Sequence, residues 1–209
     1  MSYFPIVLEM TGRRCLVIGG GVVAERKIAG LLEVGAEVTV ISPKVTEAIS
    51  HWSKNSSIQL EGRCYRIGDL AGYQLVFVAT DDADVNDRVY QEGKSCGAWV
   101  NSADDPDHCD FILPAVIRRG DLTVAISTGG ASPAATRAIR EELDDYFTAE
   151  YAQLVQVAAE VRMELKEKSL NAGAGAWNSA LKGEFRRLIR AGRPEQAKEF
   201  LLATLGAKS

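Results

Sequence analysis

The first half of the chain alternates between short apolar runs and segments in which apolar residues have helical spacing. The apolar runs predict strands at residues 16–18, 37–41, 58–65, 75–79 and 99–101, and the helical segments lie at residues 22–34, 45–54 and 84–95. The run at residues 75–79 is apolar throughout, as expected for a parallel strand buried on both faces. Strands that alternate with helices predict an α/β fold, a Rossmann-like doubly wound parallel sheet whose ligands lie beyond the carboxyl ends of the strands.

The second half follows a different pattern. Residues 111–127 predict two strands joined by a basic turn, a small β-hairpin that is not part of a Rossmann-like fold. Ser132 followed by Pro133 predicts the start of a helix, because serine favours the N-cap and proline the first helical position. The rest of the chain is helical, with a break at residues 171–175 and a last short helix at residues 194–205. These helices cannot cover the sheet themselves, so we expect them to pack on each other or on a second copy of the chain.

A glycine-rich turn joins the first predicted strand to the first helix. Gly19, Gly21 and Ala24 fit the pattern Gly-x-Gly-x-x-Gly/Ala. A diphosphate needs close approach to bare backbone, and the start of a helix offers N–H groups and the positive end of the dipole. Gly35 is suited to the end of that helix, and residues 37–41 complete a βαβ unit of the expected length. We therefore predict a dinucleotide site here. The alternative is a turn that only lets helix and strand pack closely.

The position that usually recognises the ribose holds residues of another kind. A Rossmann fingerprint places Asp or Glu at the end of the second strand, whereas this chain has Ser42, Pro43 and Lys44. Lys44 is suited to a 2′-phosphate, which would favour NADP, or it is only a solvated charge. The backbone of Pro43 and Lys44 can instead hold the adenosine ribose. These alternatives stay open at the level of the sequence.

Composition excludes several classes of protein. The 209 residues are 46% hydrophobic and 25% charged, and 24 basic against 28 acidic residues give a net charge of −4. No excess of positive charge favours nucleic acid or an anionic membrane. The chain has neither a secretory leader nor an apolar run near the ~20 residues of a membrane span, so we expect a cytoplasmic protein. Four widely spaced cysteines and two histidines predict no resident metal centre.

Two polar segments are candidates for chemistry. Residues 101–110 contain several aspartates at the end of a predicted strand, where a carboxylate beside a bound dinucleotide can take a proton from a substrate. Composition alone fits a solvated loop equally. Thr128 and the glycines before Ser132 form a second potential anion cradle, against the alternative of a plain capped helix start. Arg137 and Arg140 lie one turn apart near that start and can meet carboxylates of a ligand or pair with neighbouring acids.

Five motifs, taken together, are far more specific than the glycine turn alone. They are Pro5-Ile6, the segment 17–27 with its three glycines, the segment 79–82 followed by Val85 and Asn86, the segment 111–115, and the segment 127–133. In this order and spacing they resemble the precorrin-2 dehydrogenase family, the dehydrogenase and ferrochelatase module of siroheme synthase. The resemblance covers the first two thirds of the chain closely and the last third only as a helical tail. It implies NAD-dependent oxidation of precorrin-2 to sirohydrochlorin.

The resemblance also implies partners and individual roles. Asp104 lies on the aspartate proposed as the base of the family, and Thr128 occupies a position that is often Ser. The implied cofactor is NAD, and its expected binding residues are Gly19, Gly21, Val22, Val23, Pro43, Lys44 and Thr80. The substrate is a tetrapyrrole whose carboxylates need cations, and the candidates, besides Thr128, are Arg118, Arg119, Arg137 and Arg140.

A homodimer is implied as well, and with it a division of the chain. We expect an NAD-binding domain at residues 1–113, a dimerisation region at residues 114–147 and a C-terminal helical domain at residues 148–209. Two alternatives stay open. One is chelation of Fe²⁺ or Co²⁺ by sirohydrochlorin, with Asp104 and His108 accepting protons or guiding the metal. The other is a Rossmann module that senses a nucleotide without catalysis.

Overall fold

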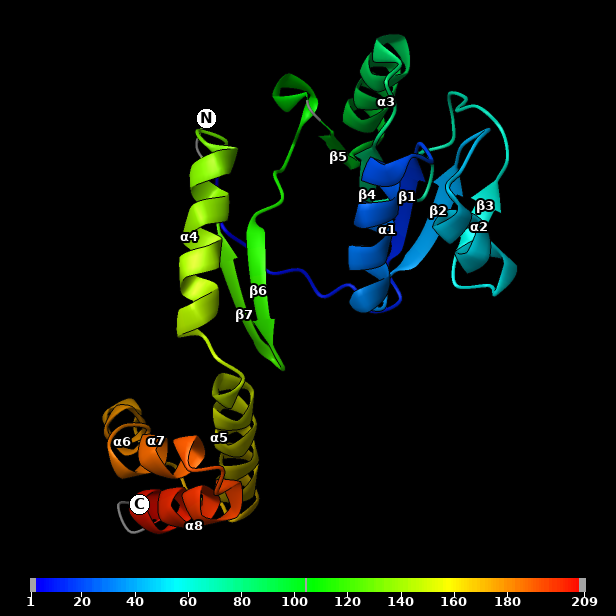
Figure 1. Ribbon diagram of the computed structural model, residues 1–209. Coiled ribbons are helices and arrows are strands. Elements are labelled where there is room, and N and C mark those ends of the chain that lie inside the picture. Colours follow the sequence, from blue (N-terminus) through cyan, green and yellow to red (C-terminus); the bar gives the residue numbers. More distant parts are fainter. Residues whose placement is uncertain (1–2, 104, 207–209) are drawn as a thin grey trace. The chain divides into compact units, whose positions relative to one another are not determined.

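The chain forms two units with separate cores, Met1–Leu113 and Pro114–Ser209 (Figure 1). The computed structural model describes residues 3–103 and 105–206. The first unit contains a five-stranded sheet and the second a two-stranded hairpin followed by helices. A separate dimerisation region that ends at residue 147 stays a prediction.

The sheet of the first unit is parallel throughout. Its strands are β1 (Arg14–Ile18), β2 (Glu37–Ile41), β3 (Gln59–Glu61), β4 (Leu75–Val78) and β5 (Trp99–Ser102). They are arranged in the order β3-β2-β1-β4-β5, which confirms the Rossmann-like prediction. The order reverses between β1 and β4, and Ile18 is level with Ile41 on one side and Val78 on the other. The carboxyl ends of β1, β2 and β4 therefore lie level at one edge of the sheet, at the point where such sheets bind ligands.

Helices cover both faces of this sheet. They are α1 (Val22–Glu33), α2 (Glu47–Lys54) and α3 (Ala83–Cys96). Ile28 of α1 and Ile49 of α2 pack against one face, and Val89 of α3 packs against the other, all three fully buried. Burial of each such side chain contributes about 1.5–3 kcal/mol. Asp82 accepts hydrogen bonds from the first N–H groups of α3, and Gly97, in the left-handed conformation, ends that helix.

Strand β3 is shorter than the strand predicted at residues 58–65. After Glu61 the chain leaves the sheet and continues in turns whose backbone is bound by a side chain of α3. The N–H groups of Gly68 and Leu70 donate to Oε1 of Glu92 on α3, at 3.1 and 3.0 Å. Tyr65 joins the buried cluster on the α3 face. Tyr65 and Leu70 are thus buried in the core although they follow the end of β3 and lie outside any strand.

The second unit begins with the predicted hairpin. Its strands are β6 (Ala115–Arg119) and β7 (Leu122–Ile126), which pair antiparallel, and the helix that follows is α4 (Pro133–Tyr146). Residues 111–114, which the sequence predicted as the start of the first hairpin strand, are not part of it, because β6 begins at Ala115. The Ser132 hydroxyl accepts a hydrogen bond from the N–H of Ala135 at 3.1 Å, which confirms the predicted N-cap.

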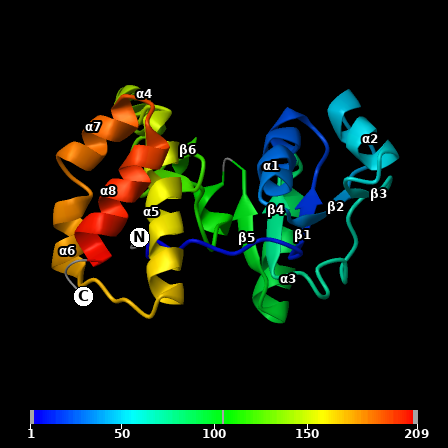
Figure 2. The ribbon, with the colours of Figure 1, turned by 90° about the horizontal axis from the view of Figure 1, so that it is seen from below.

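The remaining helices pack on each other. They are α5 (Glu150–Glu167), α6 (Ala174–Ala180), α7 (Glu184–Arg190) and α8 (Pro194–Gly206), and Figure 2 shows α5 beside α8. Val161, Phe185 and Leu201 are fully buried between them. The helical part expected between the break at residues 171–175 and the last helix consists of α6 and α7, and Gly183, which lies between them, has a φ of 54°. Among the described residues no helix is both long and apolar enough to cross a membrane.

Candidate functional site

The turn after β1 has no space for a side chain at Gly19. Its φ is 116°, a conformation that L-residues rarely adopt, and an added Cβ would lie 2.1 Å from the carbonyl oxygen of Ala79. The Gly19 N–H donates to the carbonyl of Ile41 at 3.0 Å. One glycine thus brings together the ends of β1, β2 and β4, at the edge where the strand order reverses.

Gly20 is equally crowded, which the sequence pattern does not reveal. A Cβ there would lie 2.2 Å from the carbonyl oxygen of Lys44. The loop after β2 is bent toward this turn, because the Ser42 hydroxyl donates to that same carbonyl at 2.6 Å and the N–H of Thr46 donates to the carbonyl of Gly20 at 3.0 Å. Ser42, in place of the usual acid, therefore shapes the loop. The signal in the sequence is the run of three glycines, of which the motif uses only two.

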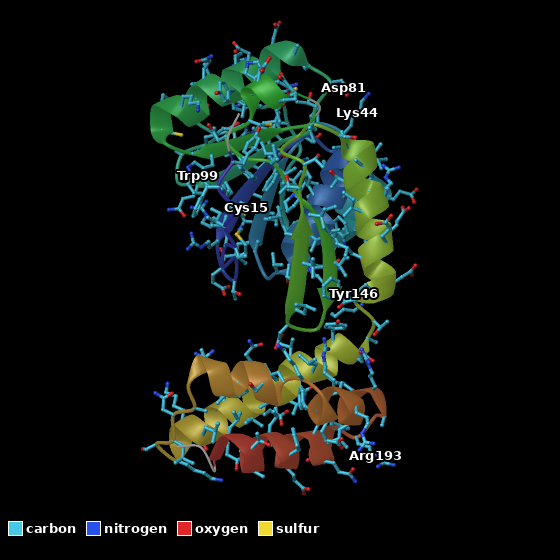
Figure 3. The ribbon with its side chains drawn as sticks, turned by 90° about the vertical axis from the view of Figure 1, so that its left-hand side faces the viewer. Cys15, Lys44, Asp81, Trp99, Tyr146 and Arg193 are labelled. Atoms are coloured by element: carbon cyan, nitrogen blue, oxygen red, sulfur yellow. The ribbon has the colours of Figure 1, made fainter. Side chains whose placement is uncertain are left out.

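Pro43 and Lys44 remain exposed, as their predicted role requires. Figure 3 shows Lys44 at the carboxyl edge of the sheet, at the same edge as Asp81, which follows β4. The cofactor residues that follow β1, β2 and β4 thus share one edge of the sheet.

Gly21 differs from both of its neighbours. It is the N-cap of α1, no side chain caps the helix there, and nothing lies within 4 Å of the place that a Cβ would take. Val22 is 66% exposed and Val23 is half-buried. The start of α1 therefore combines uncapped backbone, an open space and the positive end of a helix dipole. These residues fit the diphosphate of a dinucleotide.

Thr80 lies just after β4, next to the turn. Its hydroxyl accepts a hydrogen bond from the N–H of Asp82 at 3.1 Å, and its carbonyl accepts one from Nδ2 of Asn86 at 3.3 Å. Within the described residues, Oδ1 of Asn86 and Oγ of Ser102 are buried without a hydrogen-bond partner. Such groups are usually satisfied by a ligand or by ordered water. This edge of the sheet therefore retains unused polar groups.

The acidic loop, residues 102–110, is held by many contacts. Asp104 itself lies outside the described residues. The backbone of residue 109 bridges to that of Asn101, and the N–H of Asp110 donates to the carbonyl of Val100 at 2.8 Å. The Asp110 carboxylate also forms an ion pair with Lys94 of α3. The described part of this loop is thus folded back along β5, unlike a loop that is simply solvated.

A histidine anchors the same loop to α3. Nδ1 of His108 lies 2.5 Å from the Asp105 carboxylate, and Nε2 lies 3.5 Å from that of Asp87. The ring also packs edge-on against Tyr90. The hydrogen bond with Asp105 raises the pKa of His108, and the same bond lowers the pKa of Asp105. Both ring nitrogens face carboxylates, which favours the protonated ring, and these contacts link the loop to α3.

The substrate candidates of the second unit lie on the hairpin and on α4. Arg119 contacts Asp144 at 3.1 Å, and Arg140 lies 3.9 Å from the same carboxylate. Arg118 is exposed on β6, and Arg137 is exposed on α4. The Thr128 hydroxyl lies 3.0 Å from that of Thr136 and accepts the N–H of Ser132 at 3.1 Å. The structure thus brings Arg119 and Arg140 to one acid.

The described residues contain no group of three or more His, Cys, Asp or Glu side chains that could hold a metal ion. The cysteines lie apart and are not paired with each other. Burial raises the pKa of the Cys15 thiol to about 11. This thiol, inside β1, therefore stays protonated near neutral pH.

Comparison with known proteins identifies the family. Residues 6–115 match a family described as "Putative NAD(P)-binding", and residues 119–146 match "Sirohaem biosynthesis protein central". A solved structure described as "SirC, precorrin-2 dehydrogenase" superposes with a TM-score of 0.76 at 30% identity, covering 97% of this chain and 98% of that one. This chain belongs to the precorrin-2 dehydrogenase family. The nicotinamide nucleotide expected from the glycine turn agrees with the first match, which does not distinguish NAD from NADP.

Curated relatives of the family are longer. The siroheme synthase of Nitrosococcus oceani is 39% identical over 207 residues, which is 98% of this chain and 44% of the relative. That of Methylococcus capsulatus is 36% identical over 209 residues, again 44% of the relative. The chain thus spans less than half the length of these relatives. The family match at residues 6–115 includes every predicted cofactor residue, and the match at residues 119–146 includes Thr128 and three of the four arginines.

Proposed function

We propose that this chain oxidises precorrin-2 to sirohydrochlorin with NAD, the dehydrogenase step of siroheme synthesis. The observation that carries the proposal is the uncapped, crowded glycine turn at the point where the strand order reverses. It is the arrangement that a dinucleotide needs. Membership of the precorrin-2 dehydrogenase family supplies the substrate. We place the reaction in the cytoplasm.

The cofactor is held by backbone more than by side chains. The N–H groups of Gly21, Val22 and Val23 bind the diphosphate, because the α1 start has no side-chain cap of its own. The exposed backbone of Pro43 and Lys44 holds the adenosine ribose, and Thr80 lines the opposite side after β4. When bound, NAD supplies the hydride acceptor.

Asp104 is the base in this proposal. Oxidation removes a hydride, which goes to the cofactor, and a proton, which the Asp104 carboxylate accepts and passes to solvent. The residues around this position are fixed by the contacts of Cys109, His108 and Asp110. The extended conjugation of the product favours the reaction, so the main task of the protein is orientation.

The tetrapyrrole carboxylates are bound by cations of the second unit. Arg118, Arg119, Arg137 and Arg140 are the candidates, together with the Thr128 hydroxyl. Arg119 and Arg140 already contact Asp144, so a substrate carboxylate must share or replace that contact. We also propose a homodimer in which the hairpin and the later helices contact a second copy.

The test follows NADH formation when purified protein is mixed with precorrin-2 and NAD. We expect NADH with wild type and with Asp107→Asn, and its loss with Asp104→Asn. The two substitutions make the same chemical change in one loop, so the comparison isolates the base. Absence of NADH with wild-type protein that binds NAD would reject the proposal and favour a nucleotide sensor.

The same preparation separates metal insertion from oxidation. Sirohydrochlorin is mixed with Fe²⁺ or Co²⁺ in the absence of NAD, and the absorption spectrum is followed. A spectral change that requires the protein assigns chelation to this chain as a further step. An unchanged rate relative to buffer restricts the chain to the dehydrogenation.

A further inference from the structure

A chain of hydrogen bonds connects α1 to the acidic loop through the Asn101 side chain. The Lys27 ammonium on α1 donates to Oδ1 of Asn101 at 2.8 Å. The Asn101 amide nitrogen donates to the carbonyl of Phe111 at 2.9 Å and contacts Sγ of Cys109 at 3.6 Å. Asn101 is only 6% exposed, so these contacts are made away from water. A buried polar group that is fully paired specifies one arrangement of its neighbours.

The donors and acceptors fix which way the amide points. An ammonium only donates, so it requires the oxygen of Asn101, and the carbonyl of Phe111 only accepts, so it requires the nitrogen. Aspartate would place an oxygen against the carbonyl of Phe111. Leucine would remove both hydrogen bonds of the amide, to Lys27 and to the carbonyl of Phe111, each of which contributes about 1 kcal/mol. Asparagine therefore suits this position through its chemistry and not only its size.

Cys109 extends these contacts across the acidic loop. Its sulfur accepts the N–H of Ser102 at 3.2 Å and lies 3.2 Å from the carbonyl of Ser102 and 3.3 Å from that of Asp105. Burial raises the pKa of the Cys109 thiol, so its proton remains available for these carbonyls. The sulfur thus joins two residues, Ser102 and Asp105, that lie on either side of position 104 in the sequence.

We propose that Asn101 is a positioning residue for the dehydrogenation. It couples the acidic loop, through Lys27, to the helix whose start binds the cofactor. The inference rests on the proposed function, since the loop carries the base of that reaction. A displacement of 1 Å between a catalytic group and its substrate can cost about 100-fold in rate. A side chain that fixes the loop relative to α1 therefore acts on the rate and leaves the affinity for the cofactor unchanged.

The test compares Asn101→Leu, Lys27→Met and the double variant with wild type. We expect each single variant to lower kcat by about 10- to 100-fold, with the Kd for NAD unchanged. The double variant falls no further than the lower single variant, because both remove the same connection. Asn101→Leu can fail to fold, and Lys27→Met then tests the contact from the α1 side. Lys198→Met, which removes an ion-paired lysine from α8, is the matched control and leaves kcat unchanged.

Hydrogen exchange gives a readout that needs no substrate. The amides of Ser102 and Asp110 exchange faster in Lys27→Met than in wild type or in Lys198→Met, since the loop is no longer held to α1. Unchanged exchange and unchanged kcat overturn the inference, and so do kcat losses that multiply in the double variant. If wild-type protein forms no NADH, the proposed function is rejected independently of this inference. The exchange rates of these two amides then still decide whether Asn101 holds the loop to α1.

Discussion

Two turns of this chain contain adjacent glycines and lead into a helix, yet they differ in what satisfies the helix start. Before α1, Gly19 and Gly20 have no space for a Cβ, and no side chain caps the first turn. Before α4, Gly130 has open space around it, and the Ser132 hydroxyl caps the helix. At the first turn no side chain satisfies the N–H groups, which in the proposed function bind the diphosphate. At the second the Ser132 hydroxyl accepts the N–H of Ala135.

The comparison shows that glycine content alone does not define an anion site. What distinguishes the α1 turn is the combination of tight packing on three strand ends and an uncapped start. The Thr128 hydroxyl, in contrast, is engaged by its own helix start. A role for Thr128 with a substrate therefore requires that the hydroxyl exchange one of these contacts.

The largest expected effect is that of Gly19→Ala. The new Cβ would meet the carbonyl of Ala79 and require a left-handed backbone, so we expect a loss of about 2–5 kcal/mol in the free energy of unfolding. Urea denaturation measures it. Gly130→Ala is the matched control in the other turn, where the positive φ alone costs about 1–2 kcal/mol. Equal losses at the two positions would contradict the distinction.

Gly21→Ala should separate binding from stability. Its φ of −82° is ordinary and its surroundings are open, so the free energy of unfolding changes little. The methyl group occupies the space needed by the diphosphate, and we expect the Kd for NAD to rise at least about 10-fold, or 1.4 kcal/mol, by calorimetry. Gly30→Ala, farther along α1 and also unhindered, leaves the Kd unchanged. Equal affinities of the two variants would show that the space at Gly21 is not used.

Ser132→Ala removes the cap of the second turn. We expect a loss of about 1 kcal/mol in the free energy of unfolding, with unchanged affinity for NAD. Ser132→Asp retains an acceptor for the N–H of Ala135 and restores most of the stability. The difference between the two variants in thermal unfolding is the measurement. Two variants of equal stability would mean that the cap contributes nothing.

The smallest effect concerns the acidic loop, a turn held by charged side chains. The pKa of His108 is raised by Asp105, so its contribution to stability is complete below the ordinary value of about 6.5 and is lost as the pH rises through the raised value. At acid pH, below the ordinary carboxyl value of about 3.9, the stability from this contact is lost as the pH falls through the lowered pKa of Asp105, because the carboxylate is then protonated. Wild type should therefore exceed His108→Gln in stability between about pH 4 and pH 6.5, and the two should converge in alkali.

The control for this comparison is His51→Gln, on α2 and exposed. It should change the stability little at any of these pH values. The measurement is the midpoint of urea unfolding across the pH range. A difference between wild type and His108→Gln that persists unchanged at alkaline pH would rule out the charged contact as its origin.

Local patterns in the sequence predicted the βαβ unit, the hairpin and the start of α4. These elements depend on apolar spacing, caps and glycines within a few residues of each other. The prediction was wrong for residues 62–65, which were expected to continue a strand and instead follow the end of β3 at Glu61. Glu92, distant in the sequence, binds the N–H groups of Gly68 and Leu70 in the turns beyond. Gly183, with a φ of 54°, lies between the two short helices α6 and α7 of the helical part expected after the break.

For the candidate site, too, the sequence indicates the local features and not those that depend on packing. The sequence identifies Gly19, Gly21 and the acidic loop, because motif spacing and position after a strand are local properties. It does not reveal that the carbonyl of Lys44 crowds Gly20. Nor does it reveal that Lys27 reaches an asparagine 74 positions further along the chain. Both facts depend on how the elements pack.

The uncapped start of α1 has a consequence for the lifetime of the first unit. A ligand that binds only the folded form raises the free energy of unfolding, and this stabilisation grows with the logarithm of the ligand concentration once that exceeds the Kd. No side chain of the helix replaces such a ligand at the start of α1. In the proposed function, bound nucleotide therefore also protects the first unit from opening, and resistance to proteolysis should rise with the nucleotide concentration.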